Sequence, residues 1–133
     1  MLVLPPAFGR IMEAHAAGAA PAEACGLLIG AEADGVRTVD AVRTGLSGTP
    51  SGYTIAAADF MAAETAARVR GAFVCGVYHS HPRGPATPSA LDRALAWPGF
   101  DYVILPGDGS AMRAWRLRDD RSGFDETPLA LDG

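Results

Sequence analysis

The chain has 133 residues, a length typical of one domain, so we expect residues 1–133 to form a single domain. Apolar residues make up 49% of it and charged residues 20%, which is enough to fill a core and excludes a disordered acidic tail. The net charge is −4, from 11 basic and 15 acidic residues. This balance argues against nucleic acid and against an anionic membrane as partners, because both are bound by basic surfaces.

Both cysteines, Cys25 and Cys75, lie in apolar runs of the sequence. A secreted domain held together by disulfides would have more cysteines, placed in loops. No stretch approaches the roughly 20 apolar residues of a membrane span, and no basic segment precedes the short apolar run at the start, as a signal peptide would require. We therefore expect a cytoplasmic protein whose cysteines are inert apolar side chains.

Apolar spacing of three and four residues predicts a first helix over 7–17 and a second over 57–70, which ends at Gly71. Val69 is expected on the apolar side of the second helix, and Trp97 and Trp115 are expected in the core. Apolar or alternating runs bounded by glycine and proline predict strands. These strands are expected at 25–29, 36–42, 72–78, 102–105 and 112–117, with a last edge strand at 124–129.

Turn signals separate these elements. Asp34-Gly35 predicts a hairpin between the first two strands, and the stretch from Gly45 to Gly52 has the composition of a loop. A short third helix is expected to open at Ser89. Helices mixed with hairpin-linked strands predict an α/β (α+β) domain, with helices packed around a curved, mainly antiparallel sheet.

The segment HSHPRGPATPSALD, residues 79–92, contains the most informative pattern. His79 and His81 are two apart at the end of a predicted strand, so their side chains point to the same face and can converge on one cation. A catalytic zinc ion takes three protein ligands and leaves one position for water. The pair alone is not decisive, because exposed or helix-capping histidines also occur at this spacing.

Asp92 is the third ligand that the segment offers. Ser89 and Asp92 also fit a capping box, in which the serine caps a helix and the acid reaches back to it. Capping accounts for Ser89 but not for the two histidines on the preceding strand. The glycine and prolines between them let the chain turn back, so we favour a His-His-Asp site with an open position over capping alone.

A metal hydrolase also needs a general base. Glu23 lies just before the first predicted strand, an awkward place for a carboxylate without a partner. It could equally be a surface residue of the loop after Pro21, and the residues alone leave that choice open.

Together these residues resemble the JAMM (MPN+) metallopeptidases. The family pattern is an upstream glutamate, then H-[S/T]-H, seven residues and S-x-x-D; here it is matched by Glu23, by His79-Ser80-His81, by seven residues from Pro82, and by Ser89 with Asp92. The resemblance covers most of the chain and implies the JAMM/MPN, cytidine-deaminase-like fold.

The resemblance also implies a role for each residue of the pattern. His79, His81 and Asp92 would hold Zn²⁺, with water completing the tetrahedron. Glu23 would take the proton of that water and pass it to the leaving amine, and Ser89 would hydrogen-bond the water or the oxyanion. All five positions are filled, unlike in the inactive MPN− scaffolds.

Family members cleave peptide or isopeptide bonds after the glycine-ending tail of ubiquitin or a ubiquitin-like protein. The compact chain is most similar to the stand-alone bacterial and archaeal branch, so the expected substrate is a ubiquitin-like or sulfur-carrier protein. The loop from Gly45 to Gly52, with Tyr53, stands where members hold the substrate tail; an ordinary surface loop explains it equally well. The pattern says nothing of the oligomeric state.

Two other functions compete with this one. A non-catalytic interaction module would keep the fold and purify without stoichiometric zinc. A zinc deaminase also pairs zinc-bound water with a glutamate, but deaminases draw ligands from P-C-x-x-C, and this sequence contains no C-x-x-C.

Overall fold

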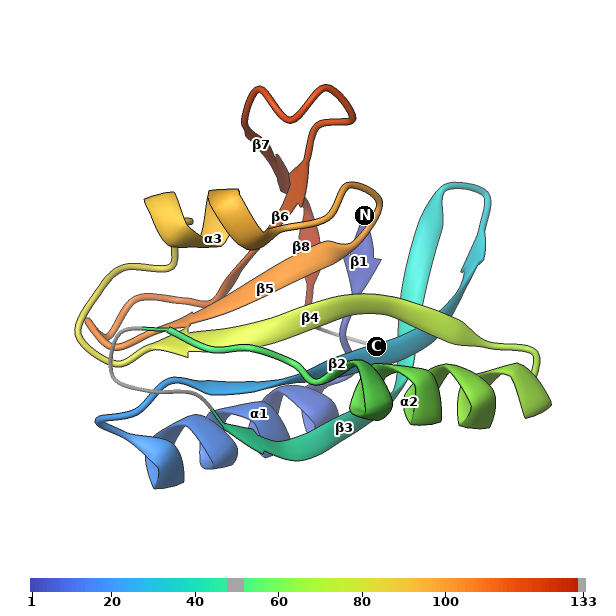
Figure 1. Ribbon diagram of the computed structural model, residues 1–133, viewed down its shortest axis with the longest axis horizontal. Coiled ribbons are helices and arrows are strands. Elements are labelled where there is room, and N and C mark those ends of the chain that lie inside the picture. Colours follow the sequence, from blue (N-terminus) through green and yellow to red (C-terminus); the bar gives the residue numbers. More distant parts are fainter. Residues whose placement is uncertain (48–51, 132–133) are drawn as a thin grey trace.

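The computed structural model describes residues 1–47 and 52–131, which form three helices and one eight-stranded mixed sheet (Figure 1). The strands lie in the order β7-β6-β5-β4-β2-β3-β1-β8. In chain order the elements are β1 (Leu2–Val3), α1 (Pro6–Ala19), β2 (Ala24–Ala33), β3 (Val36–Ser47), α2 (Ala57–Val69), β4 (Phe73–His81), α3 (Ala90–Leu95), β5 (Asp101–Pro106), β6 (Arg113–Leu117), β7 (Phe124–Thr127) and β8 (Leu129–Ala130).

The middle of the sheet combines antiparallel hairpin pairing with one parallel pair. β2 pairs antiparallel with β3 and with β4, and β5-β6-β7 is an antiparallel meander. β4 and β5 are parallel, and so are the edge pairs of β1 with β3 and β8. Parallel neighbouring strands need a crossover connection, and the connection between β4 and β5 contains α3. The crossover leads the chain from the end of β4 into α3 on one face of the sheet.

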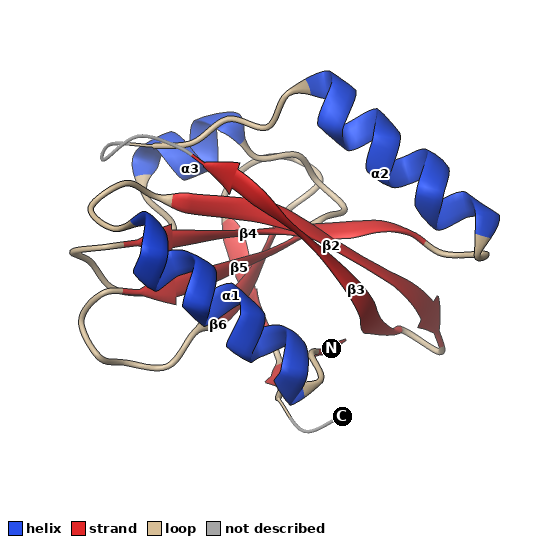
Figure 2. Ribbon diagram, turned by 90° about the horizontal axis from the view of Figure 1, so that it is seen from below, coloured by secondary structure: helices blue, strands red, loops and turns tan. Residues whose placement is uncertain are grey.

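The helices cover both faces of the sheet, with α1 on one side and α2 and α3 on the other (Figure 2). Successive strand residues alternate between the two resulting cores, as a pleated strand requires. Leu28 and Tyr78 join Met12 of α1 in one cluster. Leu27 and Val77 join residues of α2 in the other.

The sequence predicted the type of every long element, and the differences lie at the ends. The first helix runs from Pro6 through Gly18 to Ala19. β2 and β3 are both longer than expected, and β3 continues through Ser47, into the segment expected to be a loop. Residues 48–51 of that predicted loop lie outside the described residues. β1 was not predicted, because two residues are too few to show a period.

Turn and thiol predictions are confirmed. Asp34 and Gly35 both have positive φ, 53° and 77°, as the tight hairpin between β2 and β3 requires. Cys25 and Cys75 are buried free thiols, and burial raises their pKa to about 11 and about 12. No helix among the described residues is long and apolar enough to span a membrane.

Three burial predictions are wrong or only partly met. Val69 is 85% exposed, because it lies two residues past the buried Ala67 and so points away from the side of α2 that packs on the sheet. Trp97 is 68% exposed, in the segment that follows α3. Trp115 is half-buried, and its indole donates to the Ala86 carbonyl at 2.8 Å.

A second feature of the fold, outside residues 79–92, is a buried carboxylate that links four strands. Asp101, at the start of β5, has no exposed surface. Its two oxygens accept hydrogen bonds from Arg116 of β6 at 3.0 and 2.9 Å, and also from Arg37 of β3 at 3.4 Å and Thr127 of β7 at 3.3 Å. The carboxylate therefore fixes strands that are far apart in the sequence.

We predict that Asp101→Ala lowers the free energy of unfolding by about 3 kcal/mol, because it takes away the buried carboxylate that binds two nitrogens of Arg116 and leaves Arg37 with Glu32 as its remaining ion-pair partner. Denaturant unfolding measures the change. Asp125→Ala removes an exposed ion pair with Arg118 and serves as the control, with little expected change. Equal stability of the two variants would contradict the prediction.

Candidate metal centre

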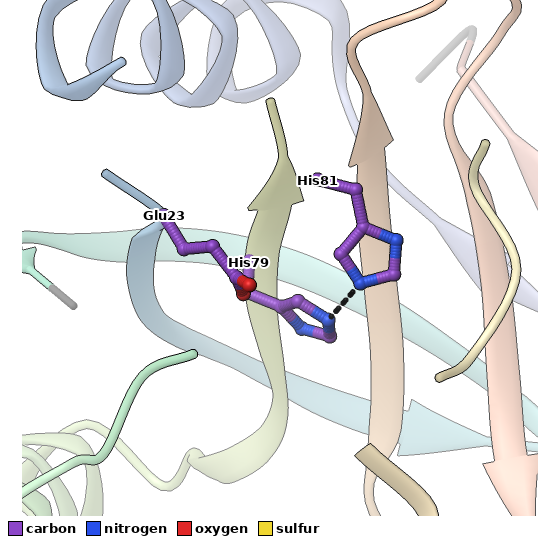
Figure 3. A group of neighbouring side chains, drawn as sticks. All are labelled: Glu23, His79 and His81. Carbon is purple, nitrogen blue, oxygen red and sulfur yellow. Dashed lines mark hydrogen bonds between the residues drawn. The ribbon is translucent and has the colours of Figure 1, made fainter. Parts of the chain in front are cut away.

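The end of β4 brings two imidazoles together. His79 is fully buried and His81 is partly exposed, and the pleat of the strand places both on the face covered by α2 and α3. Their Nε2 atoms are 3.2 Å apart (Figure 3). The predicted convergence of the two rings is confirmed.

The N-terminus of α3 supplies a carboxylate to the same point. Ser89 and Asp92 form a capping box: the Asp92 amide donates to Ser89 Oγ at 3.0 Å, and the Ser89 amide donates to Asp92 Oδ2 at 2.9 Å. The same Oδ2 lies 3.0 Å from His81 Nε2 and 3.2 Å from His79 Nε2. Asp92 therefore caps the helix and also lies against the two histidines, so both interpretations of the S-x-x-D pattern hold.

The hydrogen bond at Nδ1 of His81, the ring nitrogen that points away from Asp92, fixes where the hydrogen of the neutral ring lies. His81 Nδ1 lies 2.9 Å from the carbonyl of Pro85, which can only accept, so Nδ1 carries a hydrogen. In the neutral ring Nε2 then presents a lone pair toward the carboxylate. Two lone pairs at 3.0 Å repel unless a proton or a metal ion lies between them.

The spacing of the three atoms fits a metal ion. Ligand atoms of a tetrahedral zinc site, bound at about 2.0–2.2 Å, lie about 3.3 Å from one another. The separations here are 3.0, 3.2 and 3.2 Å. The residues present therefore fit a cation bound by two nitrogens and one oxygen.

The electrostatics favour the metal-binding forms of Asp92 and His79 and the protonated form of His81. Burial opposes ionisation of Asp92, but hydrogen bonds from the two histidines outweigh it and lower the pKa of the carboxyl. Burial lowers the pKa of His79. Burial acts in the same direction on His81, but the Asp92 carboxylate and the Pro85 carbonyl together raise its pKa. A carboxylate and a neutral imidazole are the forms that bind a metal, and a proton on His81 competes with it.

Glu23 stands beside this triad, at the entry to β2. Its ligand atom and those of His79 and His81 all lie within 4.8 Å of one another, and Figure 3 shows its carboxylate next to the His79 ring. Its Oε1 is buried with no hydrogen-bond partner among the described residues. Burial raises the pKa of the carboxyl; His81 opposes this and Asp92 adds to it. Asp92 makes the tighter triad, and Glu23 is the neighbouring carboxylate.

Ser80, between the two histidines, holds the backbone next to Glu23. Its hydroxyl lies on the opposite face of β4 and accepts the Ala24 amide at 2.8 Å, where the β2-β4 ladder ends at the pair Cys25–His79. Sequence reasoning gave Ser80 no role. The alternation of side chains in H-S-H indicates that the middle residue faces away from the two imidazoles.

Two cavities meet at Tyr53, just before α2. A small one, about 10 Å³ and so close to the least space that admits a water molecule, is lined by Glu23, Tyr53, Ser89 and Asp92 among others. A larger groove of about 560 Å³ runs from Tyr53 between α2 and the segment after α3. The groove is lined mostly by apolar and aromatic side chains.

Other residues considered from the sequence lie outside the cluster. His15 is half-buried, as expected, and its Nδ1 lies 2.6 Å from the hydroxyl of Tyr78. Arg83 is exposed. The structure thus brings together Glu23, His79, His81, Ser89 and Asp92 and excludes these two.

The comparisons with known proteins agree with this geometry. Residues 6–118 match the family described as prokaryotic homologs of the JAB domain. The chain is 39% identical over 121 residues to a desampylase of Haloferax volcanii, covering 88% of this chain and 84% of the relative.

Solved structures are similar over nearly the whole chain. A protein of Desulfitobacterium hafniense has a TM-score of 0.87 and 32% identity, covering 99% of this chain and 93% of its own. A JAB1/MPN domain protein of Archaeoglobus fulgidus has a TM-score of 0.61 and 22% identity over all of both chains, which shows the shared fold. The chain therefore belongs to the family of prokaryotic JAB (JAMM/MPN) domain proteins.

Proposed function

We propose that this protein is a zinc-dependent metallopeptidase that hydrolyses a peptide or isopeptide bond at the glycine-ending tail of a ubiquitin-like or sulfur-carrier protein. The observation that carries the proposal is the convergence of His79, His81 and Asp92 within 3.2 Å, with the buried carboxylate of Glu23 alongside. The name of the Haloferax volcanii relative, desampylase, supports a linkage to a ubiquitin-like protein as the substrate.

The chemistry is divided among the residues of the cluster. A zinc ion held by His79, His81 and Asp92 would polarise the scissile carbonyl and lower the pKa of water. Glu23 would accept a proton and pass it to the leaving amine; its burial and raised pKa suit a group that must both take up and release a proton. Ser89 Oγ accepts from the Asp92 amide, and its hydroxyl hydrogen would donate to the oxyanion.

The groove beside Tyr53 supports a polypeptide substrate. Met61, Leu95 and Trp97 line it and are 65%, 52% and 68% exposed. Exposed apolar side chains gathered in a groove are typical of interaction sites. We propose that the apolar residues of the substrate tail lie here, which would lead the tail past Tyr53 toward the histidines. We also propose a cytoplasmic location, which the two buried free thiols support.

Cleavage of a fusion protein tests the proposal. The substrate is a small ubiquitin-like protein ending in Gly-Gly, joined through that glycine to a reporter peptide. We expect stoichiometric zinc in the purified protein, release of the reporter, loss of release with a chelator and its return with added zinc. A protein with no zinc and no cleavage would instead be a non-catalytic interaction module.

We predict that Glu23→Gln keeps zinc bound but lowers kcat by about 10²–10⁴-fold, because it removes a proton acceptor and leaves the three ligands in place. Metal analysis and the fusion assay measure the two effects. Glu13→Gln, on the exposed side of α1, is the control and should retain full activity. Full activity of Glu23→Gln would show that another group accepts the proton.

We predict that Asp92→Ala weakens zinc affinity by more than the roughly 10–100-fold that changes outside the ligands cost. Competition with a chromogenic chelator measures the affinity. Ser89→Ala is the matched control, because it also breaks the capping box but keeps the backbone amide that donates to Asp92 Oδ2. Both variants should lose about 1 kcal/mol of stability. Equal zinc affinities in the two would mean that Asp92 acts only as a cap.

A further inference from the structure

The two histidines of the cluster are held in different ways. His81 is oriented by a hydrogen bond from its outer nitrogen, Nδ1, to the Pro85 carbonyl. The corresponding Nδ1 of His79 is buried and has no hydrogen-bond partner among the described residues. A histidine that binds a metal almost always donates its other N–H to an oxygen, which fixes the ring. His79 must therefore be fixed by another contact.

That contact is the ring of Tyr53. The centroids of Tyr53 and His79 are 4.5 Å apart and their planes differ by 27°, which is a stacked arrangement. The torsion that turns an imidazole about its bond to Cβ has broad minima, so a ring without an outer hydrogen bond is free to tilt. Stacking restricts the plane of the ring, and contact with Asp92 Oδ2 favours Nε2 at the inner edge.

We propose that Tyr53 is a positioning residue that aims His79 Nε2 at the cation by stacking, in place of the hydrogen bond that such a histidine ordinarily donates. The inference rests on the zinc site of the proposed function but not on its substrate. The proposed role belongs to the aromatic ring of Tyr53 and not to its hydroxyl, because the face of the ring makes the contact with His79. Stacking also suits a histidine that shares the charge of a bound cation, because the face of an aromatic ring attracts positive charge.

The location of Tyr53 distinguishes it from the other aromatic residues of the groove. The residue lies ahead of α2, on the wall that the small cavity beside Asp92 shares with the apolar groove. Phe60, one turn into α2, lines the same groove, but its ring packs edge-on against Phe100, with centroids 5.9 Å apart at 81°. Phe60 is thus a matched control: it is an aromatic residue of the same groove, but its ring stacks on no histidine in the described part of the chain.

Zinc affinity of the metal-free protein tests the inference without any substrate. Tyr53→Phe keeps the ring and should bind zinc as tightly as the wild type in a chelator competition. Tyr53→Leu should bind about 10–100-fold more weakly, the usual cost of losing the outer support of a ligand. Phe60→Leu should lower the Tm of the metal-free protein as much as Tyr53→Leu does, yet keep wild-type affinity. With Co²⁺ in place of zinc, the visible bands of Tyr53→Leu should lose intensity as the site departs from tetrahedral geometry.

Each contrary result has a distinct meaning. Tyr53→Leu with wild-type affinity would reduce the stack to ordinary packing and overturn the inference. Loss of affinity in Tyr53→Phe would assign the effect to the hydroxyl and overturn it as well. Tyr53→Met, which fills the groove with a flexible chain, decides between these results if Tyr53→Leu does not fold. A wild-type protein that binds no zinc would overturn the proposed function itself.

Discussion

The site depends on the contact between His81 and Asp92, in which two lone pairs face each other at 3.0 Å unless a proton or a metal ion lies between them. Nε2 of His79, Nε2 of His81 and Oδ2 of Asp92 lie 3.0–3.2 Å apart, and the hydrogen on His81 Nδ1 prevents the neutral ring from relieving the contact with a proton of its own. The contact between His81 Nε2 and Asp92 Oδ2 therefore needs a proton or a metal ion between the two atoms. The fold maintains it with two rigid supports, the pleat of β4 and the first turn of α3.

The connection between these two supports explains why they meet. β4 and β5 are parallel, so the chain must cross over between them, and the crossover begins where the histidines end. The capping box then fixes the orientation of Asp92, because a carboxylate oxygen has lone pairs enough to accept from the Ser89 amide and still face the histidines. The helix cap thus turns the Asp92 carboxylate toward the histidines, so the two interpretations of S-x-x-D describe a single arrangement.

Local patterns in the sequence were enough for the elements and for the cluster. Period and turn residues predicted both long helices and the central strands, and the motif named the five residues that converge. Contacts between distant segments could not be read in this way. Asp101 gave no signal of its burial between Arg37 and Arg116, because those partners come from strands far apart in the chain. Trp97 is exposed because it borders a groove, and a lone tryptophan in a sequence carries no such information.

The groups left unpaired in the structure mark where folding and chemistry conflict. A buried polar atom without a partner costs about 1–3 kcal/mol, so natural proteins retain few of them. Here Glu23 Oε1 and His79 Nδ1, the buried side-chain atoms without a partner among the described residues, belong to the same cluster. Asp101, which is buried more deeply than Glu23, has hydrogen-bond donors on both of its oxygens. The fold satisfies one buried carboxylate and leaves an oxygen of another without a partner beside two histidines, and this contrast supports the proton-accepting role proposed for Glu23.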